Sequence, residues 1–415
     1  MEPNEPIIQS LLDTDFYKFT MGQLVFLKHR DVTVKYAFKN RTKGVRLGMV
    51  IDEEKLRAEL DHVRTLSFRN SELRYLRGAI NDHSDRMFRE EYLQFLGDLK
   101  LPPYKLSMNE NEFVLEFEGK WSEAIYWETF ALSIVNELYY RKQMSGLSEF
   151  EREVVEARGR LNLAKKIEAL RKRPAIKFTD FGTRRRFSRE WQDYVVKTMS
   201  RELPPLDFRG TSNVALAFRY DLMPMGTSAH EMFMVMSGIH HDNDESIRGS
   251  HNKVLQEWWE LYGYDLSIAL TDTYGTDFFF SDFTKEQARR WKGFRQDSGD
   301  PIAFGEKVLA FYKRHDIPAD DKMIVFSDGL DVETMIRIHD HFVGKIKVSF
   351  GWGTNLTNDL GFPALSLVVK PIEANGHGLV KLSDNIAKAV GLPEDIERFK
   401  KIFGYGSSFS KECVY

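Results

Sequence analysis

A single histidine, His230, lies in a turn of small residues within the stretch MPMGTSAHEMF, and apolar side chains follow it. A neutral imidazole can act as a base or a nucleophile, and a carboxylate such as that of Glu231 can orient the ring. Small residues before the ring let a ligand approach closely. The same pattern also fits a histidine of the core whose nitrogens are bonded to neighbours. The stretch alone leaves both interpretations open.

The segment FRQDSGDP places an arginine and two carboxylates within six residues: Arg295, Asp297 and Asp300. An arginine can bind a carboxylate or a phosphate through two parallel hydrogen bonds. The carboxylates can bind sugar hydroxyls or a Mg²⁺ carried by a polyphosphate. Pro301 is typical of the first position of a helix, so a capped turn with an internal ion pair explains the same residues.

Two further turns are suited to a phosphorylated sugar. SFGWGTN, which contains Gly353 and Thr354, is a glycine-rich turn whose backbone N–H groups can surround a phosphate. It lacks the third glycine of a dinucleotide fingerprint, and the chain has no Gly-x4-Gly-Lys-Ser/Thr loop, so any ATP would be held differently. FSDGLD adds Ser327 and Asp328.

A fourth candidate is the stretch DFGTRRRFSRE. Its Phe181 can stack on a ring, and its arginines can face a polyphosphate, although a charged run is equally typical of a solvated surface. The arginines are Arg184, Arg185, Arg186 and Arg189. In contrast, His240 to Ser246 has neither the spacing of a zinc helix nor that of an EF-hand loop, so we expect a solvated loop there.

These turns must be positioned by strands, because each follows a short apolar segment after residue 174. The segments and their turns are AIKFTDFG, FRGTSN, MPMGTSAH, LSIALTDTYG, GFRQDSGDP, MIVFSDGLD and IKVSFGWGTN. Helical patterns separate most of them, and this alternation predicts parallel strands. The carboxyl ends of such strands build the site of an α/β barrel or an open α/β sheet.

The rest of the chain predicts flanking elements. We expect helices over 14–29, 53–65, 85–98, 122–142 and 148–173, and strands over 32–40 and 112–118. Thr14 or Asp15 is a candidate N-cap of the first helix. The tail reads as a hairpin with ANGHG as its turn, and its strands are expected to return to the N-terminal region.

Composition excludes several classes of protein. The 415 residues are 42% apolar with a net charge of -3, which predicts a sizeable core and no nucleic acid or membrane partner. Cys413 is the only cysteine, so neither an intramolecular disulfide nor a cysteine metal cluster can form. The first ten residues lack a basic region followed by an apolar core, and no stretch is apolar over a membrane-spanning length. We therefore expect a cytoplasmic protein.

Taken together, the motifs resemble the nicotinate phosphoribosyltransferase family of NAD salvage. The resemblance covers nearly the whole chain in order, from LLDTDFYKFTM through KFTDFGTRRRFS, GTSNVALA, MGTSAHE, FRQDSGDP, FSDGLD and GWGTNL to VKLSD. It implies that nicotinate attacks C1 of 5-phosphoribosyl 1-pyrophosphate, giving nicotinate mononucleotide and pyrophosphate, while ATP is hydrolysed. Mg²⁺ is expected to travel with the pyrophosphate and with ATP, and no fixed protein metal site is expected.

The resemblance also implies the architecture. The expected fold is α/β: an incomplete TIM-like α/β barrel of the type II phosphoribosyltransferases, spanning 146–364. An N-terminal α/β domain, 1–145, would be completed by strands from about 365–415. The family works as a homodimer, in which the TDFYKFTM segment is expected to reach the neighbouring subunit's site.

Individual roles follow from the resemblance in the same way. His230 corresponds to the histidine that ATP phosphorylates. Nicotinate would be held by Tyr17, Thr227 and Arg295, and Thr354 would contact the sugar phosphate. Gly353 and Ser327 are further candidates for substrate binding. Phe181 and Arg184 match a stacking ring and a phosphate-facing arginine of the related nicotinamide enzyme. Asp297 and Asp328 would stabilise positive charge on the ribose.

Two alternatives remain open at this point. The first is a phosphoribosyltransferase for nicotinamide or quinolinate. The second is a catalytically silent sensor of phosphoribosyl metabolites, against which the intact His230, Arg295 and Asp297 argue.

Overall fold

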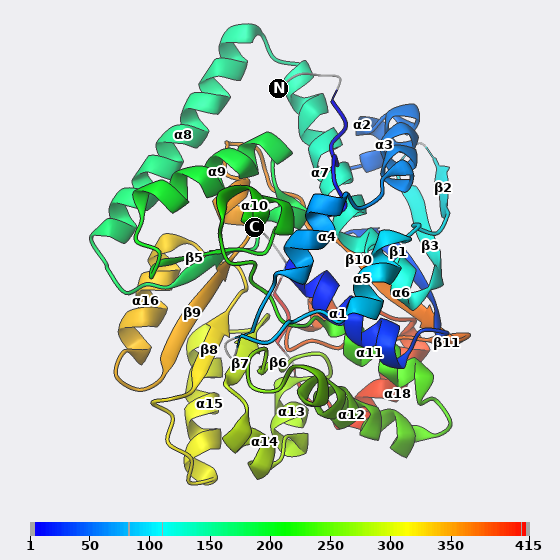
Figure 1. Ribbon diagram of the computed structural model, residues 1–415, viewed down its shortest axis with the longest axis vertical. Coiled ribbons are helices and arrows are strands. Elements are labelled where there is room, and N and C mark those ends of the chain that lie inside the picture. The colour runs from blue at the N-terminus through cyan, green and yellow to red at the C-terminus, as the bar shows by residue number, and fades with distance from the viewer. Residues whose placement is uncertain (1–4, 82–83, 110, 408, 412–415) are drawn as a thin grey trace.

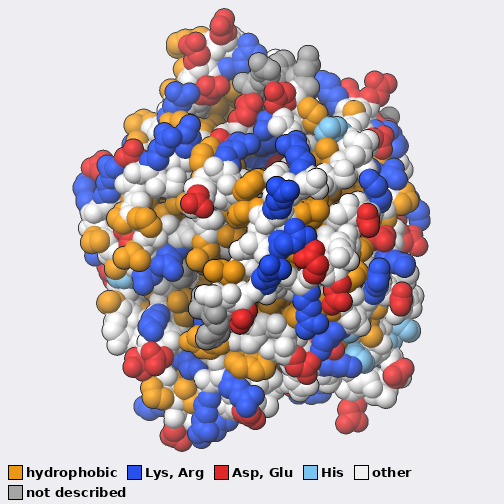
Figure 2. Space-filling model, in the orientation of Figure 1, with side chains coloured by type: hydrophobic (Ala, Val, Ile, Leu, Met, Phe, Trp, Pro, Cys, Tyr) orange, Lys and Arg blue, Asp and Glu red, His pale blue; other side chains and the backbone are white. Residues whose placement is uncertain are grey.

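The computed structural model describes residues 5–81, 84–109, 111–407 and 409–411, so Cys413 lies outside it. Two sheets organise the chain (Figure 1): a five-stranded sheet beside the N-terminal helices and a six-stranded sheet formed by the middle of the chain. Figure 2 shows Lys and Arg side chains in a column across one face, with Asp and Glu side chains beside them. Among the described residues, no helix has the length and apolar character needed to cross a bilayer.

The N-terminal part is mostly helical around three strands. Its elements are α1 Phe16–Lys28, β1 Thr33–Asn40, α2 Leu47–Val50, α3 Glu53–Thr65, α4 Asn70–Arg77, α5 Glu90–Gly97, β2 Tyr104–Met108, β3 Phe113–Lys120, α6 Trp121–Ala124 and α7 Trp127–Ser145. Helix α7 is buried on nearly all sides, so its apolar pattern has little amphipathic character.

The C-terminal tail completes the N-terminal sheet, as expected. Its elements are β10 Leu367–Ala374, β11 His377–Gly378, the 3₁₀ turn η2 Ile386–Lys388 and α18 Pro393–Phe403. The strand order is β11-β10-β1-β3-β2, and β10 pairs antiparallel with β1 from Val34 opposite Ala374 to Asn40 opposite Leu367. Asn375 and Gly376 both have positive φ, which a two-residue hairpin turn requires.

The middle of the chain alternates strands and helices. Its elements are α8 Glu149–Arg171, β4 Phe178–Asp180, η1 Thr183–Arg185, α9 Arg189–Glu202, β5 Phe208–Thr211, α10 Val214–Tyr220, α11 His230–Ile239, α12 Asp244–Tyr262, β6 Ile268–Leu270, α13 Thr276–Asp282, α14 Lys285–Arg290, β7 Gly293–Gln296, α15 Pro301–Arg314, β8 Met323–Phe326, α16 Val332–Phe342, β9 Lys347–Trp352 and α17 Thr354–Thr357.

The six strands of this region form one parallel sheet in the order β5-β4-β9-β8-β7-β6. The α/β fold with a parallel sheet is therefore confirmed, and the sheet stays open between β5 and β6, as an incomplete barrel does. Parallel strands place their carboxyl ends at one edge, so the turns after β4, β7, β8 and β9 converge there.

One expected strand is wrong. MPMGTSAH contributes a single parallel bridge, Pro224 with Thr211, in place of a ladder. Proline cannot donate a ladder hydrogen bond, and Gly226 at φ 156° turns the chain against α1. A Cβ added at Gly226 would lie 3.1 Å from the backbone N of Tyr17, so glycine permits this close approach.

Element boundaries differ from the sequence prediction in two places. The helix expected over 85–98 begins at Glu90, and the helix expected over 122–142 is divided into α6 and α7. The other predicted helices and strands agree with the structure within about two residues at each end.

A buried ion pair ties the start of the chain to the parallel sheet. The guanidinium of Arg186, 1% exposed, donates to both carboxylate oxygens of Asp13 at 2.7 and 2.8 Å. Glu137 of α7 lies 4.0 Å from Arg186 Nε, so the cation balances two buried carboxylates. Arg186 is therefore a structural residue, and it does not face a ligand.

We expect Arg186→Met to lower the free energy of unfolding by about 3–5 kcal/mol, because it leaves Asp13 buried without its cation. The control is Lys172→Met, which removes an exposed pair with Glu168 and should cost less than about 1 kcal/mol. Urea unfolding measures both. Equal losses in the two variants would contradict a structural role for Arg186.

Candidate active site

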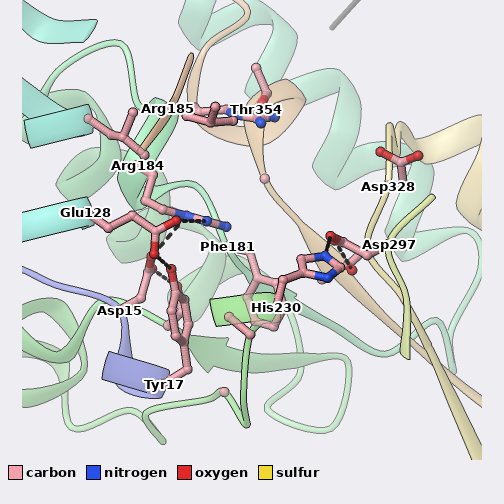
Figure 3. Close-up of a pocket in the computed structure, with 18 of the residues that line it drawn as sticks. Asp15, Tyr17, Glu128, Phe181, Arg184, Arg185, His230, Asp297, Asp328 and Thr354 are labelled. Carbon is pink, nitrogen blue, oxygen red and sulfur yellow. Dashed lines mark hydrogen bonds and ion pairs between the residues drawn. The ribbon is translucent and has the colours of Figure 1, made fainter. Parts of the chain in front are cut away.

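One cavity lies at the carboxyl edge of the parallel sheet, where the N-terminal segment and the C-terminal tail also meet (Figure 3). Ten of the eleven predicted site residues line it. They are Tyr17, Phe181, Arg184, His230, Arg295, Asp297, Ser327, Asp328, Gly353 and Thr354. The ring of Phe181 packs over Gly351 of β9, where an added Cβ would lie 2.4 Å from the ring, so the glycine makes room for it.

The eleventh residue, Thr227, lies outside the cavity lining. Its hydroxyl is directed to the carbonyl of Ile268 in β6, at 3.5 Å, and its own carbonyl accepts from the Thr20 hydroxyl at 2.8 Å. The absence of a ladder in MPMGTSAH explains this placement, because the turn packs against α1. Thr227 therefore positions the turn, and the expected contact with nicotinate has no support in its geometry.

The arginine run divides by role. Arg184 and Arg185 line the cavity, while Arg186 is buried against Asp13. Arg189 lies at the start of α9 and pairs with Glu5 at 2.9 Å. A 3₁₀ turn, Thr183–Arg185, explains why consecutive side chains point in different directions.

Tyr17 belongs to the site of its own chain. It lines the same cavity as Arg184, and the guanidinium of Arg184 lies over its ring at 5.5 Å. Helix α1 packs against the turn Gly226–Thr227 of the same chain, and this packing holds Tyr17 at the cavity. That the TDFYKFTM segment reaches the neighbouring subunit's site stays a prediction, because it concerns a second subunit.

His230 begins α11 and is buried between loops that follow two strands. Its Nε2 lies 2.9 Å from Asp297 Oδ2 and 3.7 Å from Asp272 Oδ1, and its Nδ1 lies 3.0 Å from Thr273 Oγ1. Burial lowers the pKa of His230 to about 4, and the charge of Lys381 acts in the same direction. The ring is thus a neutral imidazole at neutral pH, with a carboxylate on the nitrogen that faces the cavity.

Glu231 is not the partner of His230, contrary to the sequence prediction. Its carboxylate points into the protein and accepts from Lys18 Nζ at 2.7 Å, from Trp121 Nε1 at 2.8 Å and from the Tyr36 hydroxyl. Successive residues of a helix point about 100° apart, so neighbours in sequence face different partners.

Carboxylates and cations alternate along the cavity wall. Lys388 Nζ lies 2.6 Å from Asp328 Oδ1 and 2.9 Å from the carbonyl oxygen of Asp297. Burial raises the pKa of Asp328, whereas the hydrogen bond from His230 and the charges of Arg295 and Lys381 hold the pKa of Asp297 well below its usual range against the effect of burial. Asp297 is therefore the ionised group nearest to the histidine.

A second cluster surrounds Arg184 (Figure 3). Its Nε lies 3.3 Å from Asp15 Oδ2 and its Nη1 lies 3.5 Å from Glu128 Oε1. Glu128 also accepts from the Tyr17 hydroxyl at 3.3 Å and from Lys370 Nζ at 2.8 Å. This part of the cavity combines an aromatic ring with paired charges, which suits a polar heteroaromatic ligand.

Several residues at or beside the cavity were not predicted from the sequence, and seven of them bear on the chemistry. They are Asp15, Glu128, Asp272, Thr273, Lys370, Lys381 and Lys388. Three of the quoted motifs contain four of these residues. Asp15 lies in TDFYKFTM, Asp272 and Thr273 lie in LTDTYG, and Lys381 lies in VKLSD. Glu128 and Lys370 gave no local signal, because each lies within an apolar helix or strand.

Asp300 has the ordinary role that the sequence left open. Its side chain caps α15 by accepting from the backbone N of Ala303 at 2.7 Å, and Pro301 is the first helical residue. It does not line the cavity.

Three side chains of the site are placed close enough to share a metal ion. The potential ligand atoms of His230, Asp272 and Asp297 lie within 4.8 Å of one another. Among the described residues, Asp272 Oδ1 is buried without a hydrogen-bond partner. Two carboxylates suit Mg²⁺, which prefers oxygen ligands, better than they suit a softer metal.

An open parallel α/β sheet whose carboxyl edge is covered by a second, antiparallel sheet is the fold of the type II phosphoribosyltransferases. Residues 176–407 match the nicotinate phosphoribosyltransferase (NAPRTase) family, and residues 12–136 match the N-terminal domain of that family. The chain belongs to the nicotinate phosphoribosyltransferase family.

Solved structures agree with this assignment. The nicotinate phosphoribosyltransferase of Vibrio cholerae is 31% identical, with a TM-score of 0.86, over 97% of this chain and 95% of that chain. The Porphyromonas gingivalis enzyme is 31% identical, with a TM-score of 0.84, over 96% and 100%. A putative nicotinate phosphoribosyltransferase of Saccharomyces cerevisiae is 29% identical, with a TM-score of 0.84, over 97% and 100%.

We expect the His230 ring to stay neutral from pH 8 down to about pH 5 and to take up its proton near pH 4. The unfolded chain binds that proton near pH 6.5, so this group lowers stability as the pH falls from 6.5 towards 4. Nitrogen-15 NMR of labelled histidines measures the titration, and the resonance missing from His230→Asn assigns it. A midpoint near 6.5 would show that the ring is not buried as described.

Proposed function

We propose that the protein transfers the phosphoribosyl group of 5-phosphoribosyl 1-pyrophosphate to nicotinate, and that ATP drives the reaction through a phosphate on His230. The observation that carries the proposal is the position of His230. It is a buried, neutral imidazole on the wall of a cavity that also holds an aromatic and arginine cluster and a glycine-rich turn. Family membership supports the transfer reaction.

Nicotinate carries a carboxylate, and Arg295 is the best-placed cation to bind it. Arg295 Nη1 donates to the carbonyl of Ser228 at 2.9 Å, which fixes the side chain. Its Nε is buried and has no acceptor among the described residues, so a ligand carboxylate would satisfy it. Arg184 is less available, because Asp15 and Glu128 already balance its charge.

Asp297 and Asp328 would stabilise the transition state. Loss of pyrophosphate from C1 leaves positive charge on the ribose ring before the nicotinate nitrogen bonds to it. A fixed, ionised carboxylate in a cavity lowers the energy of that charge without reorganising. Lys388 keeps Asp328 in place, and Ser327, whose hydroxyl lies 3.2 Å from Asp297 Oδ1, does the same for Asp297.

His230 is suited to accept the γ-phosphate of ATP. A neutral imidazole nitrogen can form a bond to phosphorus while the bond to the ADP oxygen breaks. The bound phosphate would add about -1.5 to -2 charges, as other phosphorylated residues do. The cavity is also lined by Arg295, Lys381 and Lys388. The added negative charge would attract these three cations.

Mg²⁺ would enter with the pyrophosphate and ATP. The orphaned oxygen of Asp272 and the carboxylate of Asp297 fit such an ion, which would neutralise phosphate charge when bound. A homodimer and a cytoplasmic location remain part of the proposal. Within a single chain, Tyr17 already lines the cavity.

Nicotinamide or quinolinate remains the alternative substrate. Nicotinamide lacks the negative charge that Arg295 would bind, and quinolinate adds a second carboxylate next to the ring nitrogen. The charge of Arg184 is already balanced by Asp15 and Glu128. Arg184 is therefore poorly placed to bind the second carboxylate of quinolinate. The geometry therefore favours nicotinate.

We expect His230→Asn to form no phosphoenzyme with labelled ATP and to lose ATP stimulation of turnover, while slow ATP-independent transfer remains. Asparagine fills part of the space but has no nucleophilic ring nitrogen. The matched control is His341→Asn, which changes a surface histidine paired with Glu306 and should behave as wild type. Stoichiometric labelling of His230→Asn would show that another group accepts the phosphate.

Arg295→Ala should raise KM for nicotinate on the order of 10- to 100-fold, the size expected for losing a hydrogen bond to a charged group. Initial rates at varied nicotinate measure the change. Arg290→Ala removes an exposed arginine paired with Glu286 and serves as the control. An unchanged KM would eliminate Arg295 as the carboxylate-binding residue.

A further inference from the structure

Helix α8 packs on the body of the molecule with one side and faces solvent with the other. It spans Glu149–Arg171 and lies along the rim of the chain (Figure 1). Its inner side is buried at positions about four residues apart, which are Val155, Gly159, Leu163, Ile167 and Leu170. This stripe accounts for the packing of the helix on its own chain. In an ordinary surface helix the opposite side would be polar.

The outer side of α8 is apolar as well. Its exposed apolar residues recur at alternating intervals of four and three, and they are Phe150, Val154, Ala157, Leu161 and Ala164. Phe150 is 72% exposed, Leu161 55% and Val154 40%. This interval is that of the seam along which two helices pack as a coiled coil. None of the five residues lines the cavity, so the proposed reaction does not explain them.

The charges on α8 are divided along its length. Residues 149–157 contain four glutamates and one arginine, whereas residues 158–171 contain five Lys or Arg residues and one glutamate. An acidic start and a basic end also suit the helix dipole. A helix with this division complements a second copy of itself only in the antiparallel orientation, because each acidic half then faces a basic half.

We propose that the outer side of α8 is a contact surface for a second copy of this chain, with the two helices antiparallel across a two-fold axis near Ala157. A two-fold contact uses the same patch on both copies, so the patch must complement itself. The small side chain of Ala157 lets the helices approach closely at the axis. Phe150 then faces the partner's Ala164, so that a large side chain lies opposite a small one.

The same charges argue against a membrane as the occupant of this surface. Helices that lie on membranes carry Lys and Arg along the polar face, where these residues are attracted to anionic lipids. The acidic half of α8, with Glu151 and Glu153, would be repelled. The surface contains no residue of the TDFYKFTM segment, so it is separate from the expected sharing of active sites. It also holds whether or not the proposed reaction is correct.

Sedimentation velocity of the full chain over a dilution series measures the association. We expect a dimer that dissociates on dilution, because one pair of helices is small beside permanent interfaces, which bury about 2,000 Å² or more. Leu161→Glu should raise the dissociation constant on the order of 100-fold, since each dimer loses two buried leucines. Leu161 is exposed in the single chain, so urea unfolding of the dilute variant should match wild type.

The control is Leu392→Glu, which changes a similarly exposed leucine, 59%, at the N-cap of α18. It should leave the dissociation constant unchanged. A chain that stays monomeric at every concentration would overturn the proposal. A dimer that Leu161→Glu leaves intact would also overturn it, because the copies would then meet through another surface.

Cross-linking tests the orientation of the two helices. In a Cys413→Ser background, an introduced cysteine is the only thiol of the chain. Ala157→Cys lies at the proposed axis and should give a disulfide-linked dimer on oxidation with diamide. Phe150→Cys should not, because its two copies would be about 21 Å apart along the helices, beyond the reach of a disulfide. Cross-linking through Phe150→Cys and not through Ala157→Cys would overturn the antiparallel arrangement.

Discussion

The ammonium group of Lys18 holds the two halves of the site together. It is completely buried and lies 2.7 Å from both Glu128 of α7 and Glu231 of α11. Glu128 reaches the cluster around Arg184, and Glu231 is next to His230 on the helix. Removing a cation between two buried carboxylates costs several kcal/mol, so these elements keep fixed relative positions. The ion pairs of Lys18 therefore connect the part of the cavity that suits a heteroaromatic ligand to the helix that begins with the histidine.

Burial also explains why His230 differs from an ordinary surface histidine. The fold places its ring between a loop after β6 and a loop after β7, and the carboxylate of Asp297 contacts the Nε2 atom, which faces the cavity. The imidazole remains uncharged because the surroundings disfavour the cation, even with two carboxylates near it. A neutral ring next to Lys381 and Lys388 can accept a phosphate whose charge those lysines would then balance.

Hydrophobic alternation and turn residues carried enough information to predict the parallel sheet and the returning tail. Of the ten predicted site residues at the cavity, most lie in those turns, whereas Tyr17 followed only from the family resemblance. The polar ends of successive strands had to meet, whatever their exact boundaries. The sequence could not show where MPMGTSAH leaves the sheet, because that depends on Gly226 packing against α1. It also could not reveal Glu128 or Lys370. Both lie in otherwise apolar segments, and only the tertiary structure brings them to Arg184.

The central claim is that this cavity joins nicotinate to a phosphoribosyl group with the help of ATP. The most direct measurement is turnover of the purified protein with 5-phosphoribosyl 1-pyrophosphate and Mg²⁺, offering nicotinate, nicotinamide or quinolinate, each with and without ATP. The account predicts nicotinate mononucleotide and pyrophosphate as products, formed faster with ATP, and little product from the other two bases. Faster turnover of nicotinamide or quinolinate, or no effect of ATP, would contradict it.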